Sequence, residues 1–387
     1  MSKTKILLPF LLLLATAVAA WFWLWPTPPA TLAANTSLTS YLIEETAEGF
    51  AQALEPTPLT FPRDFGSHDE YQTEWWYYTG NLATADGREF GYQFTIFRRA
   101  LAPPSPETAA SASTWRTNQL YFAHFALSDV AADQFYAFER FSRGAAGLAG
   151  ATAEPYAVWI EDWGVAEQAD GSIHLQAEQT GVALDLVLSQ TRPPILHGRN
   201  GLSQKGTAPG NASYYYSQIN QTSVGTITVD GQSYAVAGHS WKDHEYSTSA
   251  LEEGAVGWDW FSLQLDNDDQ NALMLFQIRR ADGSIQAQSG GSWVTADNEV
   301  IHLEADEMQI EVGETWTSPV SGATYPAEWL IRVPRLGLEL EGRPLMANQE
   351  LNVSTTYWEG AVRFTGTLNG QPVTATGYVE MTGYEGR

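Results

Sequence analysis

The sequence predicts an all-β fold made of antiparallel barrels or sandwiches. From about residue 70 onward, segments such as GYQFTIFRR, LYFAHFALSD and NALMLFQIRR are rich in aromatic and β-branched residues, which favour strands. Asp-Gly pairs, typical of tight hairpin turns, occur at 86–87, 170–171, 230–231 and 282–283. No long segment with helical periodicity follows residue 60, so an alternating α/β architecture is not expected.

The composition predicts a large folded core with aromatic walls. The 387 residues are enough for two or three domains, and 44% of them are hydrophobic, so a packed core is expected. The chain contains 15 Trp, 17 Tyr and 16 Phe. Because such rings are costly to leave on a surface, many of them should line a core or an apolar cavity.

The charge balance and the absence of cysteine argue against several functional classes. The net charge is −25, which repels a polyanion, so nucleic acid is not an expected partner. The chain has no cysteine, which rules out disulfides, thiolate nucleophiles and cysteine-based zinc sites. No glycine-rich phosphate loop follows a strand, so nucleotide chemistry has no support.

The N-terminus predicts a hydrophobic helix over residues 1–25. Lys3 and Lys5 precede an uncharged apolar run from residue 6 to residue 25, which is long enough to span a membrane and has its basic end toward the cytoplasm. A signal peptide cleaved near Ala17-Val18-Ala19 is the alternative to an uncleaved anchor. The anchor is favoured because aromatic residues continue the run. The rest of the chain is expected outside the cytoplasm, periplasmic or at the cell surface, either anchored in the inner membrane or secreted.

Residues 26–64 are predicted to be a linker that contains one short helix. Residues 26–39 are rich in Pro, Ala and Thr. The segment SYLIEETAEGFAQAL (40–54) has the pattern of a short amphipathic helix, and Pro56 and Pro58 would end it.

An internal repeat predicts two related β domains. EWWYYTGNL (74–82), a turn and FTIFRR are echoed by GWDWFSLQL (257–265), a turn and FQIRR. Each copy has the pattern of the opening hairpin of a domain. We therefore expect one domain over residues 65–250 and a second over residues 251–387. A chance likeness between two aromatic hairpins is the alternative.

The segment GHSWKDHEYS (238–247) combines two histidines, three charged residues and two aromatic residues. A helix would give His239 and Asp243 zinc-like spacing, but the hairpin VGTITVDGQSYAVAG leads directly into His239 and favours a strand. In a strand, His239, Trp241, Asp243 and Glu245 share one face, which suits acid–base chemistry. One alternative is a metal triad of His239, Asp243 and Glu245. The other is an ordinary strand that buries Trp241 and exposes its carboxylates.

Two further carboxylates are framed by aromatic residues in the repeated segments. The residues concerned are Glu74, Trp76 and Tyr78, which share a strand face in the first copy, and Trp258, Asp259 and Trp260 in the second. A buried carboxyl group among indole rings has a raised pKa and can protonate an apolar substrate. The alternative is that the two carboxylates pair with arginines, of which Arg98, Arg99, Arg279 and Arg280 are candidates.

Together these segments resemble the AttH/CrtC family, which includes carotenoid 1,2-hydratases and proteins described as secreted hydrolases. The resemblance rests on EWWYYTGNL, GYQFTIFRR, YFAHFALSD, LHGRNGLSQKG, GHSWKDHEYS, GWDWFSLQL and the ending YWEGAVRFTGTLNGQPVTATGYVEMTGY. It implies two lipocalin-like antiparallel β-barrel or sandwich domains, an apolar pocket in or between them, and no cofactor. The hydratases of this family add water across a terminal C=C bond of an acyclic carotenoid.

The resemblance also implies roles for individual residues. His239 and Trp241 match the His-x-Trp pair of the family's hydratases, and Asp259 matches an Asp on the following strand. Asp259 would protonate the alkene, His239 would activate water or relay the proton, and Trp241 would face the cation. Asp243 and Glu245 would orient these groups or pair with arginine.

Two functions follow as hypotheses. The first is an exported, membrane-anchored hydratase or hydrolase that acts on a carotenoid-like isoprenoid or a lipid, with neither metal nor cofactor. The second is a non-catalytic carrier of an apolar ligand that works with a membrane export system, such as a transporter permease. Two departures from the family pattern keep the second hypothesis open: Gly257 replaces a Tyr, and Lys242 stands where an apolar residue is more common.

Overall fold

The computed structural model describes residues 48–105, 113–249 and 251–385. The hydrophobic helix predicted over residues 1–25 and much of the predicted linker lie outside these ranges. Within them, no helix combines the length and the apolar content that a membrane crossing requires. The end of the predicted short helix, residues 48–54, is a turn followed by residues without regular secondary structure. Gly49 explains this difference, because its φ of 95° lies in the left-handed region and interrupts a right-handed helix.

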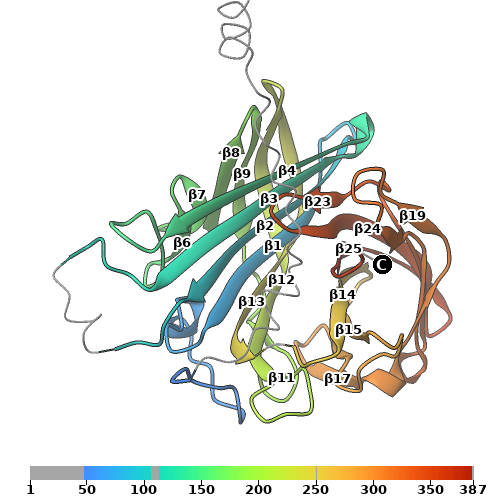
Figure 1. Ribbon diagram of the computed structural model, residues 1–387. Coiled ribbons are helices and arrows are strands. Elements are labelled where there is room, and N and C mark those ends of the chain that lie inside the picture. The colour runs from blue at the N-terminus through green and yellow to red at the C-terminus, as the bar shows by residue number, and fades with distance from the viewer. Residues whose placement is uncertain (1–47, 106–112, 250, 386–387) are drawn as a thin grey trace, which may run out of the picture. The chain divides into compact units, whose positions relative to one another are not determined.

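The prediction of an all-β antiparallel fold is confirmed. The first sheet has 13 strands in the order β4-β3-β2-β1-β13-β12-β9-β8-β7-β6-β5, with β10 and β11 paired to β12. It curls into a nearly closed barrel (Figure 1). Its strands are β1 (Thr73–Ala83), β2 (Glu89–Ala100), β3 (Gln119–Asp129), β4 (Gln134–Arg143), β5 (Ala149–Ala153), β6 (Tyr156–Ile160), β7 (Trp163–Glu167), β8 (Ile173–Gln179), β9 (Val182–Ser189), β10 (Ile195–Leu196), β11 (Leu202–Gln204), β12 (Ala212–Val229) and β13 (Gln232–Ser249).

The second sheet has 10 strands in the order β17-β16-β15-β14-β25-β24-β22-β21-β18, with β23 paired to β24. Its strands are β14 (Ala255–Asp266), β15 (Ala272–Arg280), β16 (Gly290–Val294), β17 (Val300–Glu304), β18 (Gln309–Val312), β21 (Trp329–Val333), β22 (Leu338–Pro344), β23 (Glu350–Asn352), β24 (Thr356–Leu368) and β25 (Gln371–Met381). A separate pair joins β19 (Thr315–Thr317) to β20 (Thr324–Pro326). The described residues also form the 3₁₀ helices η1 (Arg63–Phe65), η2 (Val130–Ala132), η3 (Ala305–Glu307) and η4 (Pro334–Leu336).

The strands β1 and β14 occupy equivalent positions in the two sheets. β1 lies between β2 and β13, and β14 lies between β15 and β25. Each therefore pairs with the next strand along the chain and with the last strand of its own sheet. These two strands carry EWWYYTGNL and GWDWFSLQL. The two copies of the internal repeat therefore have equivalent neighbouring strands in their sheets.

Three apolar clusters explain why these strands are aromatic on both faces. Trp76 of β1 belongs to the core of the first sheet, and Phe261 of β14 belongs to the core of the second. Tyr77 follows Trp76 in β1, and Trp260 precedes Phe261 in β14. Both Tyr77 and Trp260 belong to a third cluster, which lies between the sheets. Because successive strand residues point to opposite faces, both faces of β1 and β14 are buried and need apolar side chains.

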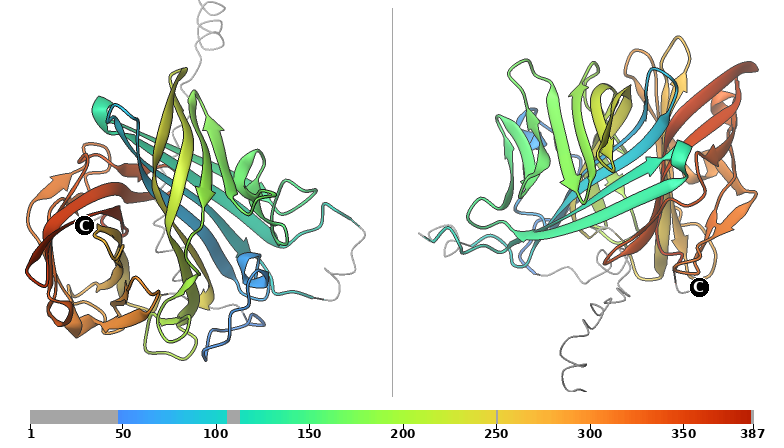
Figure 2. Two further views of the ribbon diagram at one scale, coloured as in Figure 1. Left: turned by 180° about the vertical axis from the view of Figure 1, so that it is seen from behind. Right: turned by 90° about the horizontal axis from the view of Figure 1, so that it is seen from above.

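The two sheets contact each other through β1 and β2 on one side and β24 and β25 on the other (Figures 1 and 2). A Cβ atom on Gly91 of β2 would lie only 2.5 Å from the Cβ atom of Ala361 of β24, so this approach requires a glycine. Hydrogen bonds also cross the contact. Asn81 Nδ2 donates to the carbonyl oxygen of Gly377 at 2.9 Å. The contact between the sheets is therefore close-packed and polar as well as apolar.

Candidate functional site

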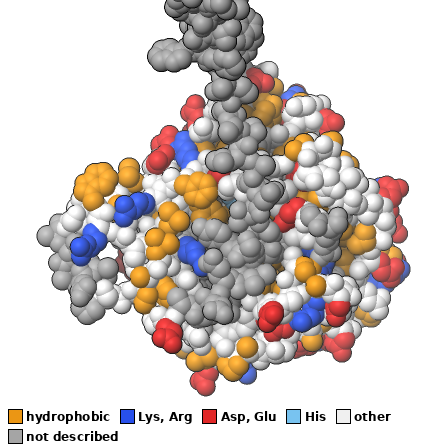
Figure 3. All heavy atoms as spheres, in the orientation of Figure 1, with side chains coloured by type: hydrophobic (Ala, Val, Ile, Leu, Met, Phe, Trp, Pro, Cys, Tyr) orange, Lys and Arg blue, Asp and Glu red, His pale blue; other side chains and the backbone are white. Residues whose placement is uncertain are grey.

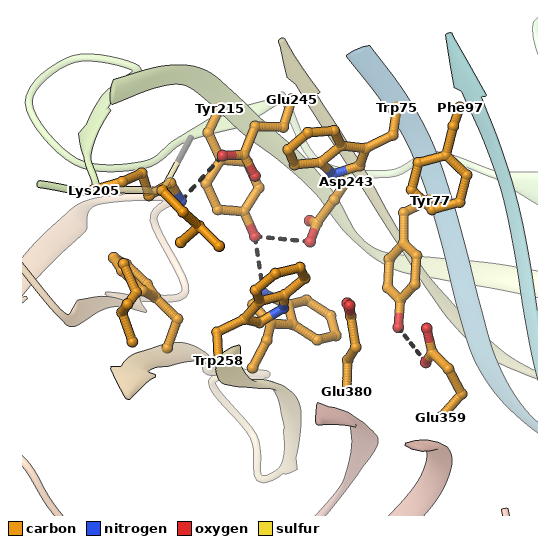
Figure 4. A pocket seen from close by; sticks show the side chains of 14 residues that line it. Trp75, Tyr77, Phe97, Lys205, Tyr215, Asp243, Glu245, Trp258, Glu359 and Glu380 are labelled. Atoms are coloured by element: carbon orange, nitrogen blue, oxygen red, sulfur yellow. Dashed lines mark hydrogen bonds and ion pairs between the residues drawn. The ribbon is translucent and has the colours of Figure 1, made fainter. Parts of the chain in front are cut away.

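A pocket lies between the two sheets, at the third apolar cluster (Figure 4). Its volume of about 90 Å³ holds several water molecules or one ring-sized group of a ligand. Half of the lining residues are aromatic, and four carboxyl groups and one ammonium group reach the pocket. The lining residues are Trp75, Tyr77, Phe97, Lys205, Tyr215, Asp243, Glu245, Leu251, Trp258, Trp260, Phe276, Ile278, Glu359 and Glu380.

The strand interpretation of GHSWKDHEYS is confirmed, because this segment lies within β13. Alternation along β13 places Asp243 and Glu245 in the pocket. Lys242 and His244 point the other way, into the barrel of the first sheet. Both faces are buried here, because the second sheet covers the face that would otherwise meet solvent.

Asp243 accepts three hydrogen bonds in the wall of the pocket. Tyr215 Oη donates to Oδ2 at 2.7 Å, and Trp241 Nε1 donates to Oδ1 at 2.6 Å. The Ser217 hydroxyl also donates to Oδ1. Burial raises the pKa of Asp243 to about 7, although these three hydrogen bonds act in the opposite direction. Asp243 can therefore exchange a proton near neutral pH.

Glu359 of β24 and Glu380 of β25 face Asp243 from the second sheet (Figure 4). They are directly paired across the β24–β25 ladder. Burial and the neighbouring Glu380 raise the pKa of Glu359 well above its ordinary value, and Tyr77 Oη donates to Glu359 Oε2 at 2.7 Å. Burial, Asp243 and Glu245 raise the pKa of Glu380 to about 8. Both glutamates are therefore carboxylic acids at neutral pH.

Sequence reasoning did not single out Glu359 and Glu380. The signal present in the sequence is an acidic residue next to aromatic and small residues on both arms of one hairpin, in YWEGAV and GYVEM. Many acidic side chains elsewhere lie on the outer surface, as the face drawn in Figure 3 shows, where solvent screens them. Burial distinguishes the pocket carboxyl groups from these.

Glu245 has a different environment, because it has a cationic partner. Lys205 Nζ lies 3.0 Å from Glu245 Oε1. The ammonium group also lies over the ring of Phe276, 4.5 Å from its centroid, and 5.1 Å from the centroid of Tyr215. Lys205 follows β11 in the segment LHGRNGLSQKG, which sequence reasoning quoted without assigning it a role. The pocket thus contains one ion pair beside its three protonatable acids.

The structure separates the three residues that the sequence predicts to be catalytic. Trp241 is buried in the cluster between the sheets and donates to Asp243. His239 lies on the same face of β13, two residues before Trp241 and four before Asp243, and it is exposed. Asp259 lies on the face of β14 opposite to Trp258 and Trp260. Neither His239 nor Asp259 lines the pocket.

Asp259 has the arginine partner that the alternative interpretation anticipates. Arg279 Nε lies 3.1 Å from Asp259 Oδ1, and Tyr384 Oη donates to the same oxygen at 3.0 Å. Trp258 and Trp260, on the other face, do line the pocket. Asp259 therefore contacts the C-terminal segment through Tyr384, whereas Trp258 and Trp260 line the pocket.

Glu74, Trp76 and Tyr78 lie inside the first barrel, on the face of β1 that points away from the pocket. Glu74 is fully buried, and Arg98 Nε lies 2.8 Å from its Oε2. Burial alone would raise the pKa of Glu74, but Arg98, followed by the hydrogen bonds of His244 and His68, holds it well below its ordinary value. Glu74 is thus a paired anion.

The described residues bring His68, Glu74 and His244 close enough to suggest a metal site, with one ligand-type atom of each within 4.8 Å of the others. Hydrogen bonds account for this grouping. Glu74 Oε1 lies 2.8 Å from His68 Nδ1 and 2.8 Å from His244 Nε2. A cation here would also meet the guanidinium group of Arg98, so the donor set favours an internal hydrogen-bond network.

Lys242 is the most unusual residue of this barrel. Its side chain is 1% exposed, and Nζ has no hydrogen-bond partner among the described residues. Four rings surround the nitrogen, and the nearest, Tyr156, has its centroid 4.4 Å away. The others are Phe65, Tyr78 and Tyr216. Burial lowers the pKa of Lys242 to about 7.

The pocket between the sheets is therefore the better candidate for chemistry. It combines protonated carboxylic acids, one carboxyl group poised near neutral pH, and aromatic faces that can stabilise a positive charge. In the first barrel, by contrast, the carboxylate of Glu74 is already paired with Arg98, His68 and His244.

Two solved structures have the same fold as this chain. The crystal structure of a protein described as an AttH from Nitrosomonas europaea is 34% identical and has a TM-score of 0.76, covering 87% of this chain and all of that one. The crystal structure of kievitone hydratase from Nectria haematococca, 14% identical, shares the fold with a TM-score of 0.67, covering 88% of this chain and 97% of that one.

A sequence match to a kievitone hydratase from Fusarium solani subsp. phaseoli is 24% identical over 213 residues. This match spans 53% of the chain and 58% of that protein, so the chain aligns with little more than half of its curated relative. The match to a protein family covers much more of the chain. The AttH-like family matches residues 52–384, which include both sheets and every residue of the pocket, and this chain belongs to that family.

Proposed function

We propose that this chain is a hydratase-like enzyme that adds water to a carbon–carbon double bond of an apolar substrate by acid–base chemistry. The observation that carries the proposal is the meeting of Asp243, Glu359 and Glu380 in one aromatic pocket, where burial raises all three pKa values. A neutral carboxylic acid in such a pocket can protonate a weakly basic alkene.

The geometry supports a division of roles between the two sheets. Glu380, with a pKa of about 8, transfers its proton to one alkene carbon and leaves a cation on the other. The rings of Trp75, Trp258 and Trp260 stabilise that cation. A water molecule then forms the new C–O bond and loses one proton to Asp243. Returning this proton to Glu380 restores both groups, so atoms and charge balance without a cofactor.

The shape of the pocket supports a substrate that inserts one end. A volume of about 90 Å³ is too small for a long polyene but suits a terminal isoprenoid unit or an aromatic ring. We therefore propose a carotenoid-like isoprenoid or a lipid as the substrate class. Two relatives are named kievitone hydratases, and kievitone is not a carotenoid. The test of the substrate class should therefore include kievitone as well as a carotenoid.

The test is hydration by the purified full-length chain in detergent. An acyclic carotenoid and kievitone are incubated separately in ¹⁸O-labelled water, and products are analysed by mass spectrometry. A product that gains one labelled water, and that disappears with Glu380→Gln, supports the proposal. Binding of these compounds without any product would contradict it.

A carrier without catalysis is the second candidate, and the apolar aromatic lining favours it. A carrier would purify with a lipid bound, which native mass spectrometry detects. Because Glu380→Gln preserves the shape of the wall, a carrier would keep the lipid in this variant. A protein that purifies empty and turns over substrate excludes this role.

We extend the proposal to location on the basis of the N-terminal run, which lies outside the described residues. The enzyme would act outside the cytoplasm, anchored in the inner membrane or secreted, and a transporter permease is the partner expected for the carrier role. A reporter enzyme that is active only outside the cytoplasm, fused after the last residue, tests this. A reporter that is active only when fused to a variant lacking residues 1–25 would contradict it.

A further inference from the structure

A chain of hydrogen bonds runs from the second sheet to Asp243 through His197. Ser292 Oγ of β16 lies 3.0 Å from His197 Nδ1, and His197 Nε2 lies 2.6 Å from Ser217 Oγ of β12. The Ser217 hydroxyl then donates to Asp243 Oδ1. All four side chains are buried, three of them with no exposed surface.

His197 is held tightly in the turn between β10 and β11. Its backbone N–H donates to the carbonyl oxygen of Tyr215 at 3.0 Å. The next residue, Gly198, has a φ of 60°, and a Cβ atom there would lie 2.2 Å from the carbonyl oxygen of Leu202. The imidazole ring packs on the ring of Tyr215 with centroids 4.3 Å apart. His197 therefore contacts both Ser217 and Tyr215, two of the three donors to Asp243.

The indole N–H groups of Trp241 and Trp260, which can only donate, fix the direction of two of the three hydrogen bonds to Asp243. The Trp260 Nε1–H group donates to Tyr215 Oη at 3.0 Å, which leaves the Tyr215 proton for Asp243. His197 can do the same for Ser217. With a proton on Nε2, the imidazole donates to Ser217 Oγ, and Nδ1 accepts from Ser292. The Ser217 proton is then directed at Asp243.

The protonation state of His197 is suited to this arrangement. Burial, followed by the charge of Lys205 and by His302, lowers the pKa of His197 to about 3. The ring is thus neutral at the pH values where Asp243 titrates, and one of its nitrogens always accepts. A neutral ring between two hydroxyl groups can transmit hydrogen-bond direction without adding charge.

We propose that His197 is a positioning residue, which acts through the Ser217 hydroxyl to hold Asp243 as an ionised hydrogen-bond acceptor facing the pocket. This inference rests on the proposed function, because it gives Asp243 the role of proton acceptor. It assigns to the segment LHGRNGLSQKG a role in the site that is not evident from its sequence.

Several other groups act on Asp243, and the test must keep them constant. The titratable groups that share the pocket wall with Asp243 are Tyr215 from β12, Glu245 from β13, Glu359 from β24, Glu380 from β25 and Lys205, which follows β11. Lys242, the neighbour of Asp243 along β13, acts on it from the opposite face. Among the described residues, the side-chain hydrogen bonds of the His197 ring go to Ser292 and Ser217 and to none of these groups, although the ring packs on Tyr215. Changes confined to the hydrogen-bond chain therefore leave the surrounding charges in place.

The first measurement is the ionisation of Asp243 itself, followed by infrared difference spectroscopy during a pH titration. The carboxyl band that is missing in Asp243→Asn identifies the residue. In Ser217→Ala the carboxylate loses one of three donors, so its pKa should rise by roughly one pH unit. His197→Phe should shift it in the same direction, and His197→Gln, whose amide can again donate to Ser217, should restore most of the original value.

The control is a second buried histidine. His124 of β3 lies 2.7 Å from Tyr357 Oη of β24, so it also bridges the two sheets but does not contact Asp243. His124→Gln should leave the Asp243 titration unchanged. An Asp243 titration that is equally unchanged in Ser217→Ala and His197→Phe overturns the inference. If His197→Phe does not fold, as judged by near-UV circular dichroism, Ser217→Ala decides alone.

The second measurement separates this inference from the proposed function. Where the wild-type chain hydrates a substrate, the pH dependence of kcat/KM should shift upward in Ser217→Ala by the same amount as the infrared titration, with little change in KM. Activity that is absent in the wild type contradicts the proposed function only. The infrared titration still confirms or overturns the positioning role of His197.

Discussion

Tyr77 and Trp260 meet edge to face across the contact between the two sheets, with ring centroids 5.3 Å apart and planes at 89°. The internal repeat aligns these two residues with each other. The candidate site therefore lies where two equivalent strands, β1 and β14, present equivalent faces. Neither sheet forms the pocket alone, because the aromatic wall and the carboxyl groups come from both.

The Tyr77–Trp260 contact should couple the stabilities of the two sheets. Edge-to-face pairs contribute about 0.5–1.5 kcal/mol beyond the area that they bury. A double-mutant cycle with Tyr77→Leu and Trp260→Leu, measured by urea unfolding, should give a coupling energy of that size. Additive effects of the two changes would indicate sheets that unfold independently.

Substitution of the pocket acids should affect the reaction much more than substitution of Asp259. Glu380→Gln removes the proposed proton donor and should lower kcat by roughly 10²–10⁴-fold. Asp259→Asn is the matched control, because Asp259 faces away from the pocket and contacts Arg279. It should leave kcat within about twofold, while a large loss in Asp259→Asn would restore the role that the family resemblance implies for this residue.

The pocket acids should make the protein less stable as the pH rises. In the unfolded chain Asp243 and Glu380 ionise near pH 4, whereas their folded pKa values are about 7 and 8. Between pH 4 and pH 8 the folded state binds more protons, so their contribution is complete below about pH 4 and is lost as the pH passes 7 and 8. The free energy of unfolding of the wild type, relative to an Asp243→Asn/Glu380→Gln variant, should therefore fall across this range. A relative stability that rises with pH would exclude the raised pKa values.

Lys242 should have the opposite pH dependence. Its folded pKa of about 7 lies below the value of about 10.4 in an unfolded chain, so its contribution to stability is complete above about pH 10.4 and is lost as the pH falls to about 7. Replacing the buried, unpartnered amine with Lys242→Met should raise the free energy of unfolding at pH 7 by about 1–3 kcal/mol. Urea unfolding of both proteins at pH 7 and pH 10 measures this. A gain that is larger at pH 10 than at pH 7 would contradict the assignment.

The fold could be predicted from local sequence because strands and hairpins are locally encoded. Asp230 and Gly231 both have positive φ values, 50° and 80°, in the turn between β12 and β13, as the Asp-Gly signal requires. The same hairpin makes GHSWKDHEYS a strand, and alternation then places Asp243 and Glu245 together.

The site could be predicted only in part, because it depends on which strand faces the second sheet covers and for what length. From His239 to Glu245 a strand advances about 20 Å, and of these two residues only Glu245 lines the pocket. One face of β13 is therefore buried at Asp243 and exposed at His239. Glu359 and Glu380 approach Asp243 from more than a hundred residues away, and no local pattern specifies that meeting.

The location of the carboxyl groups on both sheets has a consequence for motion. If the sheets moved apart, water would enter and the pKa values of Glu359 and Glu380 would fall toward those of exposed glutamates. Separation at neutral pH would therefore release protons to the solvent, and acid would hold the sheets together. A ligand that needs the sheets to part before it can enter would bind with a net exchange of protons, and its affinity would depend on pH even if the ligand itself had no charge.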